Sequence, residues 1–161
     1  MKVLTADQFD TDWSDIAVLA LDEGKYGDNA FREEGPFVLA EDTIERSFDP
    51  GKHLVLRGFP SSTNNIDYEA SSITLAGTSF GARIVGPSPM DHCIEISFND
   101  LSGCDTLDGI SGSAVFSLDK IDPPYKVNFA GMMLRGTKMS GIGHMLSGET
   151  VLKILTAAIA A

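Results

Sequence analysis

The chain has 161 residues, a formal net charge of −11 and a hydrophobic content of 43%. This length suits one domain with a buried core, and this hydrophobic content excludes an intrinsically disordered chain. The negative charge excludes nucleic acid and anionic membrane surfaces as expected partners, because both repel an acidic protein.

Short apolar runs separated by polar, glycine-rich stretches predict a protein built mainly of β-strands. The first run is headed by Asp15 and has the length of a buried strand rather than of a helix. Residues 61–67 are predicted to be a polar loop, and the strands at 73–77 and 82–86 are predicted to pair with each other. The predicted strands are 13–21, 53–60, 73–77, 82–86, 93–98, 114–118 and 127–134.

The tail has a different periodicity. Ser147 or Thr150 can cap a helix, and the apolar residues that follow have helical spacing. These apolar residues are Val151, Leu152, Ile154, Leu155, Ala158 and Ile159. Short strands at regular spacing, closed by one helix, predict an all-β barrel or sandwich with a C-terminal α-helix.

The two cysteines, Cys93 and Cys104, leave two alternatives open: one disulfide or two buried thiols. The sequence has no CxxC pair, and His92 beside Cys93 is a poor basis for a metal site, because adjacent residues rarely face one ion. No metal and no cofactor are therefore expected. The first residues do not have the pattern of a signal peptide, so none is expected, and no apolar run is long enough to predict a transmembrane helix.

The stretch 107–116 has the pattern of a nucleophile loop. Ser111 lies between Gly109 and Gly112, and an apolar strand follows at once. Small residues around a hydroxyl permit a tight turn that exposes the serine and leaves backbone N–H groups free, as a nucleophile with an oxyanion hole requires. The alternative is a simple Gly/Ser turn between two strands.

The order of motifs resembles the chymotrypsin-like (trypsin-like) serine protease family, in a diverged bacterial branch. Residues 15–19 resemble the strand that begins with the family's aspartate, and 109–113 resemble its nucleophile motif, with Ser113 in place of the usual third glycine. Residues 129–136, then 143–145 and a terminal helix, resemble the segments that come after that motif in the family. Residues 53–60 resemble the entry to the second of the family's two barrels.

The resemblance implies a role for each matching residue. Ser111 would be the nucleophile, the N–H groups of Gly109 and Ser111 the oxyanion hole, and Asp15 the carboxylate that orients a histidine. Asp105 would be the pocket carboxylate for a substrate Arg or Lys, with Gly136 and Gly143 as small pocket walls. On their residues alone, Asp15 also fits a solvated strand start, and Asp105 fits a turn.

The positions of the histidines differ from those in the family. In that family the histidine precedes the aspartate, whereas His53, His92 and His144 all follow Asp15. None of the three is assigned as the base. The chain is expected to be either a truncated piece of a protease or a product that never had the base. Ile110 also replaces the family's acidic residue before the serine, which argues against activation by a freed N-terminus.

The sequence thus predicts a chymotrypsin-like double β-barrel. Residues 1–45 would be a remnant of the N-terminal barrel, and 46–161 would be a complete C-terminal barrel with the terminal helix. The predicted function is a trypsin-like serine endopeptidase that is inactive, or nearly so, as this chain stands. The alternatives are a non-catalytic pseudoprotease that binds peptides or proteins, and a structural β-domain.

The expected partners are a peptide or protein substrate and either a second copy or an N-terminal segment that completes the first barrel. Loss of most of a barrel leaves open strand edges and an apolar face, which favour association. We expect a cytoplasmic protein if the chain is complete and a secreted one otherwise.

Overall fold

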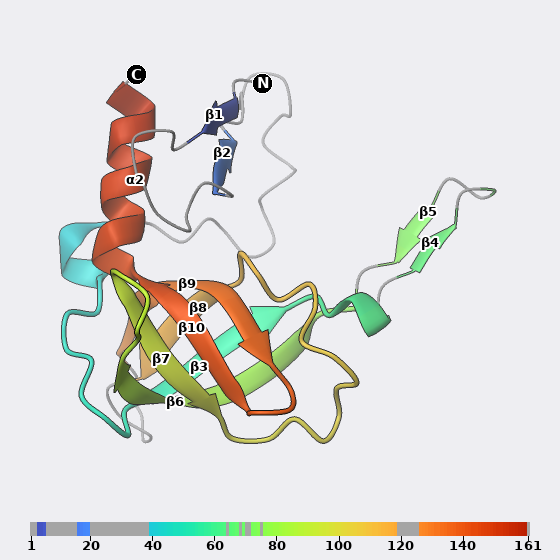
Figure 1. Ribbon diagram of the computed structural model, residues 1–161. Coiled ribbons are helices and arrows are strands. Elements are labelled where there is room, and N and C mark those ends of the chain that lie inside the picture. The colour runs from blue at the N-terminus through green and yellow to red at the C-terminus, as the bar shows by residue number, and fades with distance from the viewer. Residues whose placement is uncertain are drawn as a thin grey trace.

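The structure is a computed structural model that describes residues 3–5, 16–19, 39–63, 65–67, 69, 72–74, 76–118 and 126–160. Its centre is a closed barrel of six antiparallel strands in the order β10-β7-β6-β3-β8-β9 (Figure 1). The barrel strands are β3 (His53–Gly58), β6 (Thr78–Pro87), β7 (Cys93–Phe98), β8 (Ala114–Leu118), β9 (Val127–Thr137) and β10 (Ile142–Ser147).

Two three-stranded meanders make up the barrel. Strands β3, β6 and β7 form the first, and β8, β9 and β10 form the second. After β7 the chain returns through residues 99–113 to place β8 beside β3, which is a Greek-key connection. Pairing of β10 with β7 closes the barrel. The Greek-key connection is the segment that carries Ser111.

Alternation along the strands fills the barrel with apolar side chains. In β3, Leu54 and Leu56 are buried while Val55, between them, is exposed. The same interior cluster holds Phe80 of β6 and Met133 of β9. It also includes Ala82, Ile84, Ile96, Phe98, Cys104, Leu107, Ile110, Val115, Ala130 and Met145.

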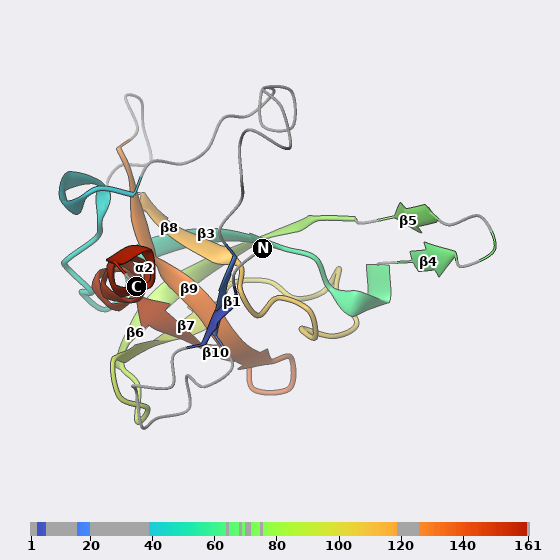
Figure 2. The same cartoon turned by 90° about the horizontal axis from the view of Figure 1, so that it is seen from above.

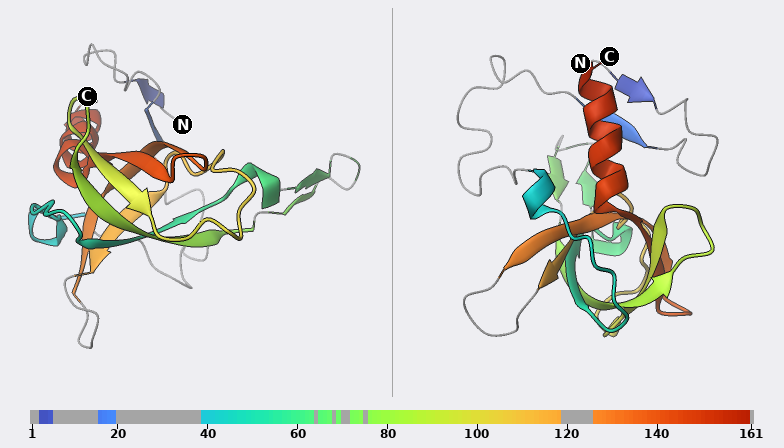
Figure 3. Two further views of the ribbon diagram at one scale, coloured as in Figure 1. Left: turned by 60° about the horizontal axis from the view of Figure 1, so that its bottom comes forward. Right: turned by 90° about the vertical axis from the view of Figure 1, so that its left-hand side faces the viewer.

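The C-terminal helix α2 (Gly148–Ala160) rises from the end of β10 and stands away from the barrel (Figures 1 and 3). Ser147 caps it, because its Oγ accepts the N–H of Thr150 at 3.4 Å. Val151 and Ile154 of the first turns are buried in a second apolar cluster with Phe129 and Leu146 of the barrel wall. The helix is therefore attached to the barrel through its N-terminal half.

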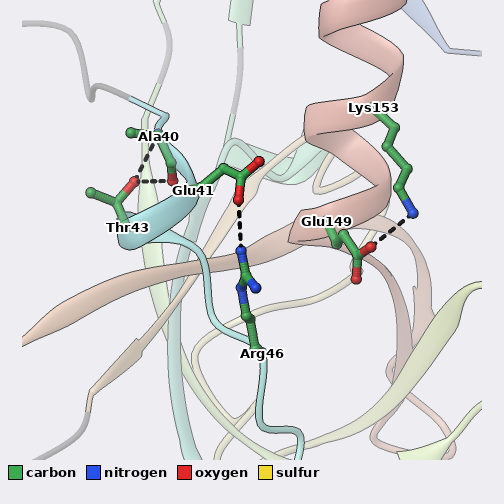
Figure 4. A network of polar contacts seen from close by, with 6 residues as sticks. All are labelled: Ala40, Glu41, Thr43, Arg46, Glu149 and Lys153. Atoms are coloured by element: carbon green, nitrogen blue, oxygen red, sulfur yellow. Dashed lines mark hydrogen bonds and ion pairs between the residues drawn. The ribbon is translucent and has the colours of Figure 1, made fainter.

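Surface ion pairs flank the base of the helix (Figure 4). Arg46 lies 3.0 Å from Glu41, on the segment with the short helix η1 (Glu41–Thr43), and Lys153 lies 2.8 Å from Glu149. All four side chains are largely exposed. Such pairs contribute little to stability, so the apolar cluster beneath them holds the helix.

Two small sheets lie outside the barrel. One pairs β1 (Val3–Thr5) with β2 (Ala17–Leu19). The other pairs β4 (Asn65–Asp67) with β5 (Ser72–Thr74) in a hairpin that projects sideways from the barrel (Figure 2). This hairpin follows the short helix η2 (Ser61–Thr63), so it begins directly beside the end of β3.

The predicted strands at 93–98 and 114–118 and the C-terminal helix are confirmed. The strands predicted at 53–60 and 127–134 are present with other ends, since β3 ends at Gly58 and β9 continues to Thr137. The prediction that 73–77 pairs with 82–86 is wrong, because β5 pairs with β4 while β6 pairs with β3 and β7. The loop prediction for 61–67 is also wrong, because this stretch contains η2 and β4. Strand β10 was not predicted.

Candidate functional site

The loop that carries Ser111 is anchored at one end of the barrel by three buried side chains. Cys104, Leu107 and Ile110 are 4%, 4% and 0% exposed and belong to the interior cluster. Ser111 and Gly112, which come next in the chain, are exposed. The apolar residues thus hold the loop down, and the serine lies at its surface.

Two glycines allow this loop to lie against the end of β3. Gly109 has a φ of +91°, and a Cβ there would lie 2.6 Å from the carbonyl oxygen of Phe59. A Cβ at Gly58 would lie 2.9 Å from Ile110 Cγ2. The N–H of Ser61 then donates to the carbonyl of Asp108 at 2.8 Å. Any side chain at Gly109 would disrupt this contact between two backbones.

Backbone hydrogen bonds fix the turn around the serine. The N–H of Gly112 donates to the carbonyl of Met133 at 2.8 Å, and the N–H of Met133 donates to the carbonyl of Ser113 at 2.9 Å. Within the described part of the chain, the N–H groups of Gly109 and Ser111 have no acceptor. These are the two N–H groups that the resemblance assigns to an oxyanion hole.

The hydroxyl of Ser111 donates to the carbonyl oxygen of Leu134 at 2.5 Å. Leu134 lies at a bulge of β9, because Arg135 pairs with His144 and Met133 pairs with Met145. Bulges re-aim backbone groups, and this one directs a carbonyl towards the loop with Ser111. The sequence analysis did not name Leu134 as a site residue, since a backbone acceptor leaves no residue-type signal.

All three histidines lie in described segments, and none forms a hydrogen bond with Ser111. His53 begins β3, about 17 Å along the strand from Gly58, at a rise of about 3.3 Å per residue. His92 is exposed in a turn with a φ of +59°. The Nδ1 atom of His144 is 2.9 Å from the Oγ of Ser88. The structure therefore supplies no histidine base to the serine.

The other predicted site residues are only partly brought together. Asp15 lies outside the described residues. Asp105 is exposed in the loop, Gly136 is half-buried on β9, and Gly143 is buried on β10. Gly136 and Gly143 are directly paired across β9 and β10, so the structure places the two glycines side by side.

A buried polar cluster that was not predicted joins the segment before β3 to strand β8. Glu45 is 5% exposed and accepts hydrogen bonds from Lys52, from the hydroxyl of Ser117 at 2.6 Å and from the N–H of Ser47 at 2.8 Å. Burial raises the pKa of Glu45, but these hydrogen bonds and the charge of Lys52 lower it more, to about 2. Because Ser117 is fully buried and the Glu45 carboxylate is enclosed, neither group can reach a ligand from solvent, and the cluster has a structural role.

Cys93 and Cys104 are both free and buried. Of the two alternatives left open by the sequence, a disulfide or two buried thiols, the structure therefore has the buried thiols. The described segments contain no group of three or more His, Cys, Asp or Glu side chains that could hold a metal ion. Among the same segments, no helix has the length and apolarity needed to cross a membrane.

Comparison with known proteins gives no relative. No family model matches the chain, and no curated protein or solved structure is detectably similar to it.

Proposed function

We propose that the chain is a chymotrypsin-like serine hydrolase that transfers an acyl group through Ser111, with peptide bonds as its substrate. One observation carries the proposal. Ser111 is exposed on a turn where two backbone N–H groups, those of Gly109 and Ser111, have no acceptor among the described residues. The N–H groups of the neighbouring Gly112 and Ser113, in contrast, both donate to backbone carbonyls. A pair of free donors such as that of Gly109 and Ser111 stabilises the oxyanion of a tetrahedral intermediate.

The chemistry would proceed in two steps. The Ser111 oxygen attacks the substrate carbonyl, its proton passes to a base, and the leaving amine departs with a proton to give an acyl-serine. Water then attacks the acyl-serine and releases the acid, and the hydroxyl regains its proton. The Leu134 carbonyl orients the resting hydroxyl but cannot take up its proton. The reaction therefore needs a base other than the group that now holds the serine.

The architecture supports the family assignment of the proposal. All six barrel strands lie between His53 and Ser147, within the range 46–161 that the resemblance gives to a complete second barrel. The loop with Ser111 directly precedes β8, and α2 closes the chain, as the resemblance implies. The double-barrel fold, with residues 1–45 and Asp15 as the remnant of the first barrel, is part of this proposal.

The end of β9 suits a peptide substrate. Strand β9 continues to Thr137, whereas its pairing with β8 ends at Met132 and Ala114. Beyond the bonds of Met133, the described loop makes no backbone pair with β9 on that side. This edge begins at Leu134, beside the serine, and an extended peptide could add to it as a strand.

Chemical rescue tests the proposal. The chain is treated with an activated acetyl ester, with and without added imidazole, and acylation of Ser111 is measured by mass spectrometry of the intact protein and its peptides. Imidazole, acting as the missing base, should accelerate acylation at Ser111. Ser111→Ala should abolish it, and the matched variant Ser113→Ala, on the same loop, should retain it. Acylation that is unchanged in Ser111→Ala would disprove the proposal.

The second candidate is a peptide-binding pseudoprotease. It is favoured by one observation, the absence of a hydrogen bond between Ser111 and any of the three histidines, all of which lie in described segments. In that case an extended peptide binds along β9 with the same affinity in the parent chain and in Ser111→Ala, and imidazole has no effect. Titration of both proteins with one peptide, beside the rescue experiment, distinguishes the two functions.

A further inference from the structure

We propose that the wall of the barrel formed by β3 and β6 binds an acidic segment of a partner protein, with the guanidinium groups of Arg57 and Arg83 as anchors for two carboxylates. The inference is independent of the acylation proposed for Ser111. It rests on the charge, exposure and spacing of the side chains on the outer face of these strands. This basic face consists of His53, Val55, Arg57, Phe59, Ser79 and Arg83.

The basic face lies on the opposite side of the barrel from the helix. In the closed strand order, β3 and β6 lie across the barrel from β9 and β10. The helix α2 packs on β9 and β10, and Figures 1 and 3 show it on the far side of the barrel from β6. Alternation along the strands leaves Val55, Arg57 and Arg83 exposed. The helix therefore leaves this wall open to solvent.

The charge of this wall is opposite to that of the whole chain. The chain has 23 Asp and Glu residues against 12 Lys and Arg residues, yet neither β3 nor β6 contains an acidic residue. Within the described part of the chain, Arg57 and Arg83 form no ion pair and no hydrogen bond. Arg46, in contrast, is paired with Glu41. Two arginines without a carboxylate favour a partner that supplies carboxylates.

An acidic residue that borders the face is bound within its own loop. The N–H of Asn99 donates to the carbonyl of Gly81 of β6 at 2.9 Å, so the chain after β7 passes beside the face. Asp100 comes next and accepts the N–H of Ser102 at 2.8 Å. Its carboxylate forms no ion pair with Arg83 in the described part of the chain. The two arginines are therefore not neutralised from this loop.

The side chain of Arg57 lies beside an exposed aromatic ring. A Cβ at Gly77 would lie 2.6 Å from Arg57 Nε and 3.2 Å from Phe59 Cε1. Both side chains thus lie against the backbone of Gly77. Phe59 is 43% exposed, and Val55 is 38% exposed. A guanidinium binds a carboxylate through two parallel N–H groups, and the apolar surface beside it suits an apolar residue of the same segment.

The spacing of the arginines indicates the pattern of the partner segment. Arg83 is paired with His53, and Arg57 follows His53 by four residues on β3. The two arginines are therefore about 13 Å apart along the strands, at about 3.3 Å per residue. An extended segment has the same spacing between acidic residues four positions apart, and its middle residue would face Val55. A segment with the pattern Glu-x-Leu-x-Glu meets these requirements.

A protein segment fits this face better than a nucleic acid does. Exposed apolar side chains lie between and beside the arginines, namely Val55 and Phe59. The net charge of −11 repels a long polyanion, whereas a short segment with two carboxylates needs only the two local cations. The partner is therefore expected to present a few acidic residues interspersed with apolar ones.

Binding of matched peptides tests the proposal. Fluorescein-labelled Glu-Ser-Leu-Ser-Glu and Gln-Ser-Leu-Ser-Gln are titrated with the protein at low salt, and fluorescence anisotropy is measured. The glutamyl peptide should bind saturably and at least about fivefold more tightly than the glutaminyl peptide, with a loss of affinity in added salt. Equal affinities, or no binding of either peptide, would overturn the inference.

Substitutions assign the binding to this face. Arg57→Gln and Arg83→Gln should each weaken binding of the glutamyl peptide at least about threefold. Arg57→Lys should have an intermediate affinity, because it keeps the charge without the planar fork. The control Arg46→Gln removes the same charge near the base of α2 and should leave the affinity unchanged. An equal loss in Arg46→Gln would show that binding depends on overall charge and would overturn the inference.

Two further measurements test other occupants of the face. Sedimentation of the parent and of Arg57→Gln should give the same mass for both. Self-association of the parent that Arg57→Gln abolishes would assign the face to a second copy of the chain. A labelled single-stranded oligonucleotide should bind more weakly than the glutamyl peptide, and tighter binding would assign the face to nucleic acid. Either of these assignments would overturn the inference.

Discussion

The hydroxyl of Ser111 donates a hydrogen bond of 2.5 Å to the carbonyl of Leu134, so the exposed serine is held by the strand β9 that runs beside it. This bond forms at the surface, where water can replace either partner. It orients the side chain without contributing much to the stability of the fold, which makes Ser111 a suitable position for substitution.

Ser111→Ala should therefore lower the free energy of unfolding by only about 1 kcal/mol, the usual net value of one hydrogen bond. Denaturant-induced unfolding of the variant and the parent measures this difference. A loss of several kcal/mol would mean that the serine is a structural member of the loop. In that case Ser111→Ala would not serve as a control in the acylation experiment.

Gly109→Ala should be far more harmful than Gly112→Ala. Both glycines have positive φ, +91° and +84°, but an alanine Cβ at Gly109 would lie 2.6 Å from the carbonyl oxygen of Phe59, while Gly112 has open space. We expect about 1–2 kcal/mol of destabilisation at Gly112 from backbone strain alone. The loss at Gly109 should exceed this value, as urea unfolding of the two variants will measure. Equal losses would show that the contact with Phe59 is unimportant.

Glu45 should make the protein acid-sensitive. Its pKa is about 2 in the folded chain against 4.5 without the fold, so its stabilising contribution is present above pH 4.5 and is lost as the pH falls through about 2. The shift corresponds to roughly 3 kcal/mol at neutral pH. Glu45→Gln should be destabilised by about this amount at pH 7, and the difference from the parent should shrink towards pH 2.

Thermal unfolding from pH 7 to pH 2 checks the behaviour of Glu45. The control is Glu41→Gln, since Glu41 makes an exposed ion pair with Arg46 and its loss should have little effect at any pH. A constant difference between Glu45→Gln and the parent over this range would contradict the prediction.

The two cysteines should be unreactive in the folded protein. Both thiols are free, and Cys93 and Cys104 are each 4% exposed. A thiol reagent such as dithionitrobenzoate should modify neither in native conditions and both in denaturant, because the reactive thiolate must reach solvent. Addition of a reductant should leave the melting temperature unchanged. A drop in that temperature would instead indicate a disulfide.

The strands that the sequence predicted correctly are those with a clear local pattern. Strand β7 alternates apolar and polar residues, and β3 ends at a glycine followed closely by a proline. Strand β10 lacked such a signal because it contains Gly143 and His144. Its glycine is explained only by the fold, where Met133 and Phe98 occupy the place of a side chain.

The hairpin of β4 and β5 could not be predicted for a similar reason. Residues 61–67 are mainly polar, and polarity alone favours a loop. Pairing of β4 with β5 left β6 to extend as a ten-residue strand between β3 and β7. The choice among these pairings depends on which strands form the barrel together, and a short stretch of sequence does not contain that information.

At the candidate site, the residue pattern identified Ser111 and Gly109 but not their surroundings. The contact of Gly109 with Phe59 joins residues far apart in the sequence, as does the bond from Ser111 to Leu134. The pattern also could not show that Phe98 lies against Gly136 and Gly143. Residue types in a sequence suggest a chemistry, whereas contacts between distant strands become visible only in the folded structure.

The closed barrel also has a consequence for how the protein folds. Closure joins Leu54 to Ser117 and Cys93 to Leu146, pairs that are about sixty and fifty residues apart in the sequence. Such distant pairing slows folding, to the range of milliseconds to seconds for barrels of this kind. The turn with Ser111 depends on Met133 and Leu134 of β9, so it forms only after β9 has joined the barrel. A partly folded chain would therefore expose apolar strands before the turn with Ser111 has formed.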